Sequence, residues 1–411
     1  MSKKTNHSDS SSKKYMSGAF LFITLMGIVS LFSDMTHEGA RSILGEFLNL
    51  TGATAATIGF VSGLGELLGY GLRIVSGRLA DKSKHYWTFI IVGYAIQVLA
   101  IPALALTGEN GWIFACSMVI LERVGKAVKK PAKNTLVSFA SSEIGVGKGF
   151  AYQEFLDQLG AFLGPVMLFF IGMIKGSGDL FSTYRLSFAF LGIPAAITIA
   201  LVLLAKVKYP DPEVFAKKEE KTEKFVTGKP FVFYTIAISL FAFGFIDFTI
   251  ITLHASKSQL FSGETLSLLY ALAMIVDAFA ALLFGWLYDK IGLKSLMISS
   301  FLSAFFSVFV FVSGTQMAMI LGIVLWGVGM GAQESVMKAA VSGFVPKRLR
   351  STGFGIFETA FGISWFFGSW LLGYLYDYNL YLMVVLSVLF QLVAIVFYIL
   401  SQRGAAKYQN E

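Results

Sequence analysis

The sequence predicts an all-α membrane protein with twelve transmembrane helices in two pseudo-symmetric six-helix bundles. Hydrophobic residues make up 55% of the 411 residues, and Asp, Glu, Lys and Arg together make up 14%, against about 25% in soluble domains. The mean hydropathy is +0.69. So little charge excludes a soluble enzyme, a nucleic-acid binder and a disordered chain. We therefore expect lipid to surround most of the protein.

Twelve apolar stretches are each long enough to cross the roughly 30 Å hydrocarbon core of a bilayer as a helix. Long apolar runs without two-residue alternation are expected to be helical there, because lipid offers the backbone no hydrogen-bond partner. We place the spans at residues 17–38, 52–75, 87–107, 111–130, 149–173, 185–205, 231–254, 264–287, 295–314, 316–340, 352–376 and 379–401.

A polar segment that contains Pro210, Pro212 and a run of Lys and Glu separates the spans six and six. We therefore expect five parts in the chain. They are a disordered cytoplasmic tail at 1–16, an N-terminal six-helix bundle at 17–205, a cytoplasmic linker at 206–230, a C-terminal six-helix bundle at 231–402 and a cytoplasmic tail at 403–411.

The basic residues predict the orientation, because cytoplasmic loops retain Lys and Arg. With both termini inside, the cytoplasmic segments hold 25 of the 33 Lys and Arg residues. This asymmetry also explains the net charge of +8 without a nucleic-acid partner. We expect a multi-pass protein of the plasma (inner) membrane that acts as a monomer. One cysteine and four histidines argue against a metal site, and we expect no cofactor.

The two halves contain an internal repeat. The run Gly77-Arg-Leu-Ala-Asp81-Lys82 recurs 208 residues later as Gly285-Trp-Leu-Tyr-Asp289-Lys290, at the inner end of the second span of each half. A nearby offset of 204 residues pairs Glu154 with Glu358 and Gly164 with Gly368. Two related bundles with a site between them suit alternating access, because rocking exposes the site to each side in turn.

This repeated element resembles the signature of the major facilitator superfamily, and the chain resembles that family over essentially its whole length. The resemblance implies a cytoplasmic gate, whose residues here are Gly77, Asp81, Lys82, Lys130, Gly285, Asp289 and Lys290. In such a gate Asp81 meets the amides near 351–354 and a cation such as Lys129 or Lys130, and Asp289 meets the amides near 147–150. A helix N-terminus stabilises a carboxylate in this way.

The fifth span contains Gly160-Ala-Phe-Leu-Gly164-Pro165, which resembles a motif of drug:proton antiporters and implies export. Small residues four apart also let helices pack closely. Both interpretations of these residues stay open.

Ionisable residues at membrane depth cost about 2.5–3.5 kcal/mol each and are functional candidates. Asp34, His37, Glu38 and Arg41 share one face of the first span, since residues three and four apart are neighbours on a helix. They are expected either to bind ions and substrate or to form an ion cluster that seals the outer vestibule. Glu66 and Asp277 lie near the midplane in equivalent helices. We expect Asp34, Glu38, Glu66 and Asp277 to carry the coupling ion.

The substrate-binding candidates are six further ionisable residues at membrane depth and two aromatic residues: His37, Arg41, Glu122, Arg123, Asp157, Asp247, Phe361 and Trp365. Arg123 is expected to pair with Asp157 or with a substrate anion. Lys129, Lys130 and Lys133 are expected at the cytoplasmic interface, with gate pairing to Asp81 as a second possibility.

Together these features predict a secondary active transporter, and not an enzyme, that moves a small organic, amphipathic solute by alternating access. We expect proton coupling, with sodium as an open alternative, and favour export by antiport. The alternatives are a proton-coupled uptake symporter of a polar solute and a lipid-handling or non-transporting receptor protein on the same fold.

Overall fold

The computed structural model describes residues 5–144, 146–175, 179–211, 214, 228–344 and 350–409, and within these ranges it contains helices and no strand. Ten helices in the described part are long and apolar enough to cross a membrane. The all-α prediction is therefore confirmed. The other two long helices are α4 and α14, and α4 carries six charged residues between Glu122 and Lys133.

The helices of the N-terminal half are α1 (Thr5–Leu50), α2 (Ala55–Ser83), α3 (Tyr86–Ala103) with the 3₁₀ turn η1 (Leu104–Leu106), α4 (Trp112–Ile144), α5 (Val146–Lys175), α6 (Leu180–Phe190) and α7 (Gly192–Lys208). Those of the C-terminal half are α8 (Lys229–Gly244), α9 (Phe248–Lys257), α10 (Thr265–Ile291), α11 (Lys294–Ala304), α12 (Phe306–Phe311), α13 (Gln316–Phe344), α14 (Arg350–Tyr378) and α15 (Leu380–Gln409).

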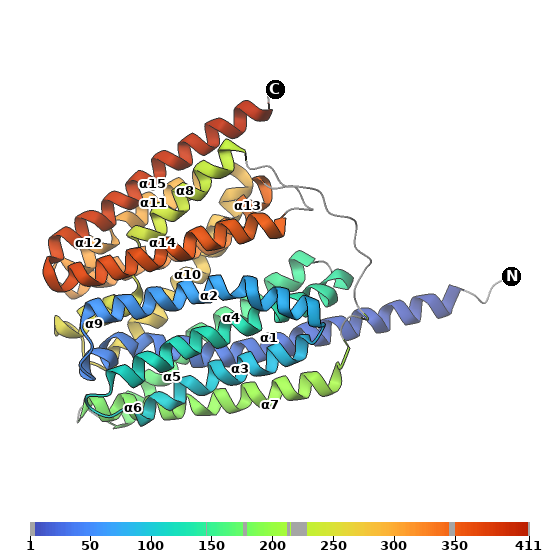
Figure 1. Cartoon of the computed structure of the whole chain (residues 1–411), viewed down its shortest axis with the longest axis horizontal. Coiled ribbons are helices and arrows are strands. Elements are labelled where there is room, and N and C mark those ends of the chain that lie inside the picture. Colours follow the sequence, from blue (N-terminus) through green and yellow to red (C-terminus); the bar gives the residue numbers. More distant parts are fainter. Residues whose placement is uncertain are drawn as a thin grey trace.

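The two halves lie on either side of a boundary along which α2 and α14 pack together, with α5 and α10 forming a second contact (Figure 1). Both ends of the chain lie at the same end of the bundle. We call this end the termini side and the other end the opposite side.

The seventh span is broken, whereas the sequence predicts one continuous helix at 231–254. It divides into α8 and α9, because Asp247 begins a new helix as an N-cap and accepts a hydrogen bond from the Thr249 amide at 2.9 Å. Backbone groups freed inside a membrane need partners. Trp326 Nε1 donates to the Ile246 carbonyl at 3.0 Å, and Ser387 Oγ donates to the Gly244 carbonyl at 2.7 Å. The break is therefore compensated and leaves Asp247 buried against Arg41 of α1.

Equivalent glycines let equivalent helices pack closely in the two halves. A Cβ on Gly164 would lie 2.2 Å from the Met35 carbonyl oxygen of α1, and a Cβ on Gly368 would lie 2.2 Å from the Phe243 carbonyl oxygen of α8. Gly160 meets α1 in the same way, at 2.1 Å from the Leu31 carbonyl oxygen. The glycine spacing of the fifth span thus serves close packing of α5 on α1, and Pro165 lies inside α5 beside it.

Helix α1 begins at Thr5, although the sequence predicts disorder at 1–16. Once the apolar span is helical, each further residue adds a hydrogen bond at little cost, and α1 extends beyond the other helices on the termini side (Figure 1). Most of the predicted linker at 206–230 lies outside the described residues.

Candidate functional site

A cavity of about 1620 Å³ lies between the two halves. A smaller pocket of about 110 Å³ adjoins it and shares Glu38, Arg73 and Lys126 with its lining. Toward the mouth the lining includes Arg78 and Asp81, which belong to the last turns of α2 on the termini side. The cavity therefore opens on the termini side.

Contacts between the halves close the opposite side. An Arg41 guanidinium nitrogen lies 3.1 Å from Asp247 Oδ2, and the Tyr270 hydroxyl donates to Glu38. These two contacts join α1 to the broken seventh span and to α10. Further hydrogen bonds across the boundary join Ser62 with Thr249 at 3.0 Å and the Ala56 amide with Asp377 Oδ2 at 3.1 Å.

The charged face of α1 lies along the cavity. Asp34, Glu38 and Arg41 line it, with Arg41 and Glu38 also making the closing contacts. His37 turns instead toward α4, where its Nδ1 atom lies 3.1 Å from a Glu122 carboxylate oxygen. His37 and Glu122 are 4% and 1% exposed, so they support the cavity wall from behind.

Arg123 is at the centre of an ion-pair network in the N-terminal half. It lies 3.0 Å from Glu66 and 3.5 Å from Glu122, and one of its nitrogens is 3.4 Å from His37 Nε2. The prediction that Arg123 pairs with Asp157 is wrong. Asp157 lies level with Lys133, at 3.8 Å, ten residues or about 15 Å farther along α4. The packing register of α5 against α4 decides this pairing, and the sequence does not encode it locally.

Lys129 and Lys133 are only 5% and 7% exposed, so the prediction that they lie at the cytoplasmic interface is wrong. They are one turn apart on α4 and point toward α1 and α3. Lys129 donates to Ser33 Oγ at 3.0 Å and lies 3.7 Å from the centre of the Tyr94 ring, while Lys133 donates to Ser30. These hydroxyl and aromatic partners make burial of the two ammonium groups possible. All three lysines line the cavity, and Lys130 also lines the smaller pocket.

The C-terminal half contributes one buried carboxylate and an apolar wall. Asp277 lines the cavity and is 2% exposed, and its Oδ1 atom has no hydrogen-bond partner within the described part of the chain. Phe361 and Trp365 line the smaller pocket with their ring centres 5.5 Å apart. Trp365 Nε1 is buried and likewise without a partner among the described residues.

The predicted gate residues lie around the open mouth of the cavity. Asp81 is exposed and accepts a hydrogen bond from the Tyr86 hydroxyl at 3.2 Å, and Gly77 lines the cavity on the same helix. Lys82 and Lys290 are exposed, and no neighbouring atom lies within 4 Å of a Cβ placed on Gly285. The Asp289 side chain and the side chains near 147–150 and 351–354, where its partners and those of Asp81 are predicted, lie outside the described residues.

Several lining residues were not predicted as site residues, namely Tyr70, Arg73, Lys126, Met330, Gln333, Glu334 and Met337. Their spacing contains the signal that could have identified them. Tyr70 and Arg73 follow Glu66 at i+4 and i+7, and Glu334 and Met337 follow Met330 at the same spacing. Residues at these intervals share one helix face, so a single candidate on α2 extends to a whole stripe.

Sequence comparison identifies relatives over nearly the full chain. The model described as Major Facilitator Superfamily matches residues 15–258 and 232–411. An uncharacterized protein of Mycobacterium tuberculosis is 36% identical over 384 residues, which is 92% of both chains. An uncharacterized MFS-type transporter of Methanocaldococcus jannaschii is 26% identical over 370 residues, or 86% of this chain and 88% of that protein.

Two solved structures with the same fold are described as transporters or their homologues. A bacterial homologue of the human lysosomal transporter Spinster, in an inward-facing and occupied conformation, has a TM-score of 0.73 at 17% identity and covers 95% of this chain and 97% of its own. A variant of the nucleoside transporter NupG has a TM-score of 0.73 at 14% identity, covering 93% and 99%. These structural similarities establish the fold. Because the family model matches two ranges that together span residues 15–411, the chain belongs to the major facilitator superfamily of membrane transporters.

Proposed function

We propose that the protein is a proton-coupled secondary active transporter that moves a small organic solute by alternating access, with both termini in the cytoplasm. The central observation is that the cavity is open on the termini side and closed on the opposite side by Arg41 and Glu38, which also line it. Residues that line the cavity and also hold one side closed can couple ligand binding in the cavity to the opening of that side. On this proposal the structure is the inward-facing state.

Asp277 is the leading candidate for the proton carrier. A buried carboxylate that lacks a cation partner is costly in its charged form, and taking up a proton removes that cost. Glu66 and Glu38 differ, because Arg123 and Arg41 lie within ion-pair distance of them. Asp34 lines the same cavity on α1. We propose that Asp277 binds and releases the proton, and that Asp34, Glu38 and Glu66 adjust the charge balance around it.

Export by antiport is the favoured direction. The glycine-proline element of α5 supports it by its resemblance to a motif of drug:proton antiporters. Uptake of a polar solute by symport is the second candidate, and the observation that favours it is the number of charged groups along the cavity wall. A lipid-handling or receptor role would show itself as binding without proton movement.

The test uses purified protein in liposomes that contain a pH-sensitive dye, with an imposed pH gradient and a panel of organic cations, anions and peptides. We expect substrate-dependent proton movement in the wild type and its loss, by at least tenfold, in Asp277→Asn. Asp179→Asn is the control, because Asp179 caps α6 outside the cavity and is exposed.

The direction of proton movement relative to the solute separates antiport from symport. Proton movement that is unchanged in Asp277→Asn would overturn the assignment of the carrier. Solute flux that ignores the pH gradient would overturn proton coupling altogether.

A further inference from the structure

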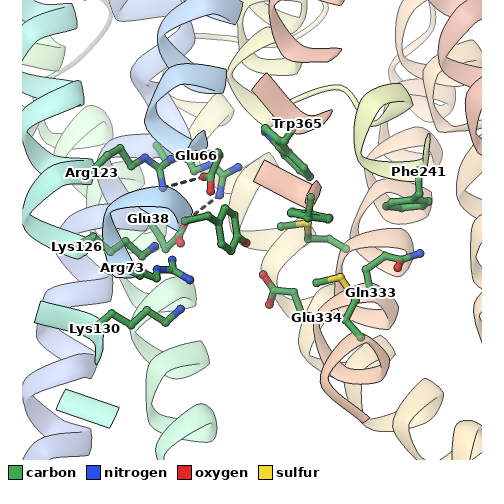
Figure 2. Close-up of a pocket in the computed structure, with 15 residues that line it drawn as sticks. Glu38, Glu66, Arg73, Arg123, Lys126, Lys130, Phe241, Gln333, Glu334 and Trp365 are labelled. Atoms are coloured by element: carbon green, nitrogen blue, oxygen red, sulfur yellow. Dashed lines mark ion pairs between the residues drawn. The ribbon is translucent and has the colours of Figure 1, made fainter. Parts of the chain in front are cut away.

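The cavity is divided by charge between the two halves. Among the described residues, the cations that line it and the smaller pocket come from α1, α2 and α4: Arg41, Arg73, Arg78, Arg123, Lys126, Lys129, Lys130 and Lys133. In the same described part of the chain, α8, α10, α13 and α14 contribute carboxylates, a glutamine, a threonine and apolar or aromatic side chains, and no cation. Figure 2 shows Arg123, Lys126, Arg73 and Lys130 on one side and Phe241, Gln333 and Glu334 on the other. Within the described part of the chain, a ligand in this space therefore meets cations on the N-terminal wall, which also holds Asp34, Glu38 and Asp157, and a largely apolar wall opposite.

Three cations of the N-terminal wall, Arg41, Arg123 and Lys133, have a carboxylate partner within 3.8 Å. Arg41 contacts Asp247 and Arg123 contacts Glu66, so neither is free to bind a further charge at full strength. Lys126 differs, because within the described part of the chain its amino group makes no hydrogen bond or ion pair while it lines both pockets. Arg73 follows Tyr70 by one turn of α2. Its guanidinium lies 4.0 Å from the Glu358 carboxylate, which is a long distance for an ion pair. Lys126 and Arg73 are the cations most available to a ligand.

The smaller pocket holds more positive than negative groups. Five of its lining side chains are Arg or Lys (Arg41, Arg73, Arg123, Lys126 and Lys130), and three are Glu (Glu38, Glu66 and Glu334). A wall with this excess, away from bulk water, favours a negatively charged ligand, because electrostatic attraction is stronger where the dielectric constant is low. In the smaller pocket Glu38 and Glu66 already lie within ion-pair distance of Arg41 and Arg123, so a cationic ligand there would compete with these arginines.

The facing wall suits an apolar or aromatic body. Phe241, Met330, Met337, Phe361 and Trp365 line the smaller pocket together, and methionine and aromatic side chains adapt to varied apolar ligands. Trp365 Nε1 is a buried donor with no partner among the described residues. Buried polar groups normally have hydrogen-bond partners, so this N–H is available to an oxygen of the ligand.

From this division we propose that the substrate is an amphipathic organic anion, whose acidic group binds Lys126 and Arg73 and whose apolar body packs on Phe361 and Trp365. The inference rests on the proposed transport function and specifies its substrate class. The anionic group is a carboxylate or a phosphate ester, since an ammonium and a guanidinium bind both. Trp365 Nε1 donates to a ligand oxygen in this arrangement.

The test is equilibrium binding by isothermal titration to the purified full-length protein, without any gradient. The probes are octanoate, 3-phenylpropionate and 2-naphthoate, each with its neutral amide and its primary amine, and 1-naphthyl phosphate as the phosphate ester. We expect the acids to bind at least tenfold more tightly than the matching amides, and the amines to bind most weakly. This comparison needs no variant, so folding does not affect it. The ratio of the dissociation constants of 2-naphthoate and 1-naphthyl phosphate shows whether the site prefers a carboxylate or a phosphate ester.

Variants then locate the site. Lys126→Gln is expected to reduce the preference for acid over amide at least tenfold, and Lys206→Gln, at an exposed position in the last turn of α7, is expected to leave it unchanged. Trp365→Phe keeps an aromatic ring but removes the N–H, so it should weaken acids and amides alike by a few-fold, about the value of one hydrogen bond.

Equal or tighter binding of the amides or amines, binding of none of the probes at millimolar concentration, or an unchanged preference in Lys126→Gln would overturn the substrate class. Proton-coupled flux of a cation would overturn it too and leave the transport proposal standing. Acid-selective binding without any flux would support the substrate class and overturn the transport proposal.

Discussion

The N-terminal and C-terminal halves share their helix arrangement but treat buried charge differently. In the N-terminal half Arg123 contacts both Glu66 and Glu122, and Lys133 contacts Asp157. In the C-terminal half, as far as the chain is described, Asp277 is buried without a cation partner and most of the cavity wall is apolar. The N-terminal half thus buries an ion-pair network, whereas Asp277 of the C-terminal half is buried without a cation partner among the described residues.

The repeat preserves helix packing in the two halves, whereas the side chains along the cavity differ. Gly164 and Gly368 occupy equivalent positions and bring equivalent helix pairs into backbone contact, so the two halves share this packing. The side chains that face the cavity are not the same. We propose that the N-terminal half holds the substrate charge and that the C-terminal half carries the proton, which keeps the two charges on opposite walls.

The largest expected effect comes from breaking the N-terminal network. Arg123→Ala leaves Glu66 and Glu122 without their guanidinium partner inside the protein, and removing one member of a buried ion pair typically costs about 3–5 kcal/mol. We expect a large fall in the midpoint of thermal unfolding in detergent. Asp277→Asn, which breaks no ion pair among the described residues, should leave the midpoint nearly unchanged. A fall of similar size in both variants would contradict the contrast between the halves.

The second prediction concerns the packing that the halves share. Gly164→Ala and Gly368→Ala should each lower the free energy of unfolding by about 1–3 kcal/mol, the usual cost of overpacking, because each new Cβ would lie 2.2 Å from a carbonyl oxygen. Gly285→Ala is the control, with no neighbouring atom within 4 Å of its Cβ. Urea or thermal unfolding of the three variants provides the measurement. A stable Gly164→Ala beside an unstable Gly368→Ala would mean that the repeated packing is not equivalent.

The sequence predicts those properties that depend on composition and helix periodicity. The spans, the six-and-six division and the shared face of Asp34, Glu38 and Arg41 follow from residue spacing alone. The partner of Arg123 does not, because it depends on how α2 and α5 are aligned against α4. Lys129 and Lys133 resemble loop lysines in sequence, and only the positions of Ser33 and Tyr94 on other helices explain their burial.

The break between α8 and α9 also escapes sequence reasoning. The residues around Asp247 are apolar and of helical character, and the groups that satisfy the freed backbone, Trp326 and Ser387, are 80 and 143 residues away in the chain from the carbonyls they bind. An aspartate in the middle of an apolar span indicates function or an N-cap. The local sequence does not decide between these two roles, because the decision depends on the distant partners of the backbone.

The smallest of these effects tests the contact that joins the two halves. Asp247→Asn keeps the Oδ1 acceptor that caps α9 but replaces the carboxylate that contacts Arg41 at 3.1 Å. Loss of about 1.4 kcal/mol from one conformation shifts a two-state equilibrium tenfold. We therefore expect Asp247→Asn to populate the state that is open on the opposite side.

The readout is thiol labelling at Asn134→Cys, in the cavity lining, after replacement of the single cysteine, Cys116, by Ala. Labelling should slow several-fold in Asp247→Asn and stay unchanged in Asp179→Asn, which alters an equivalent N-cap that makes no contact between the halves. Equal labelling in both would show that the Arg41 contact is a structural ion pair that leaves the conformational equilibrium unchanged.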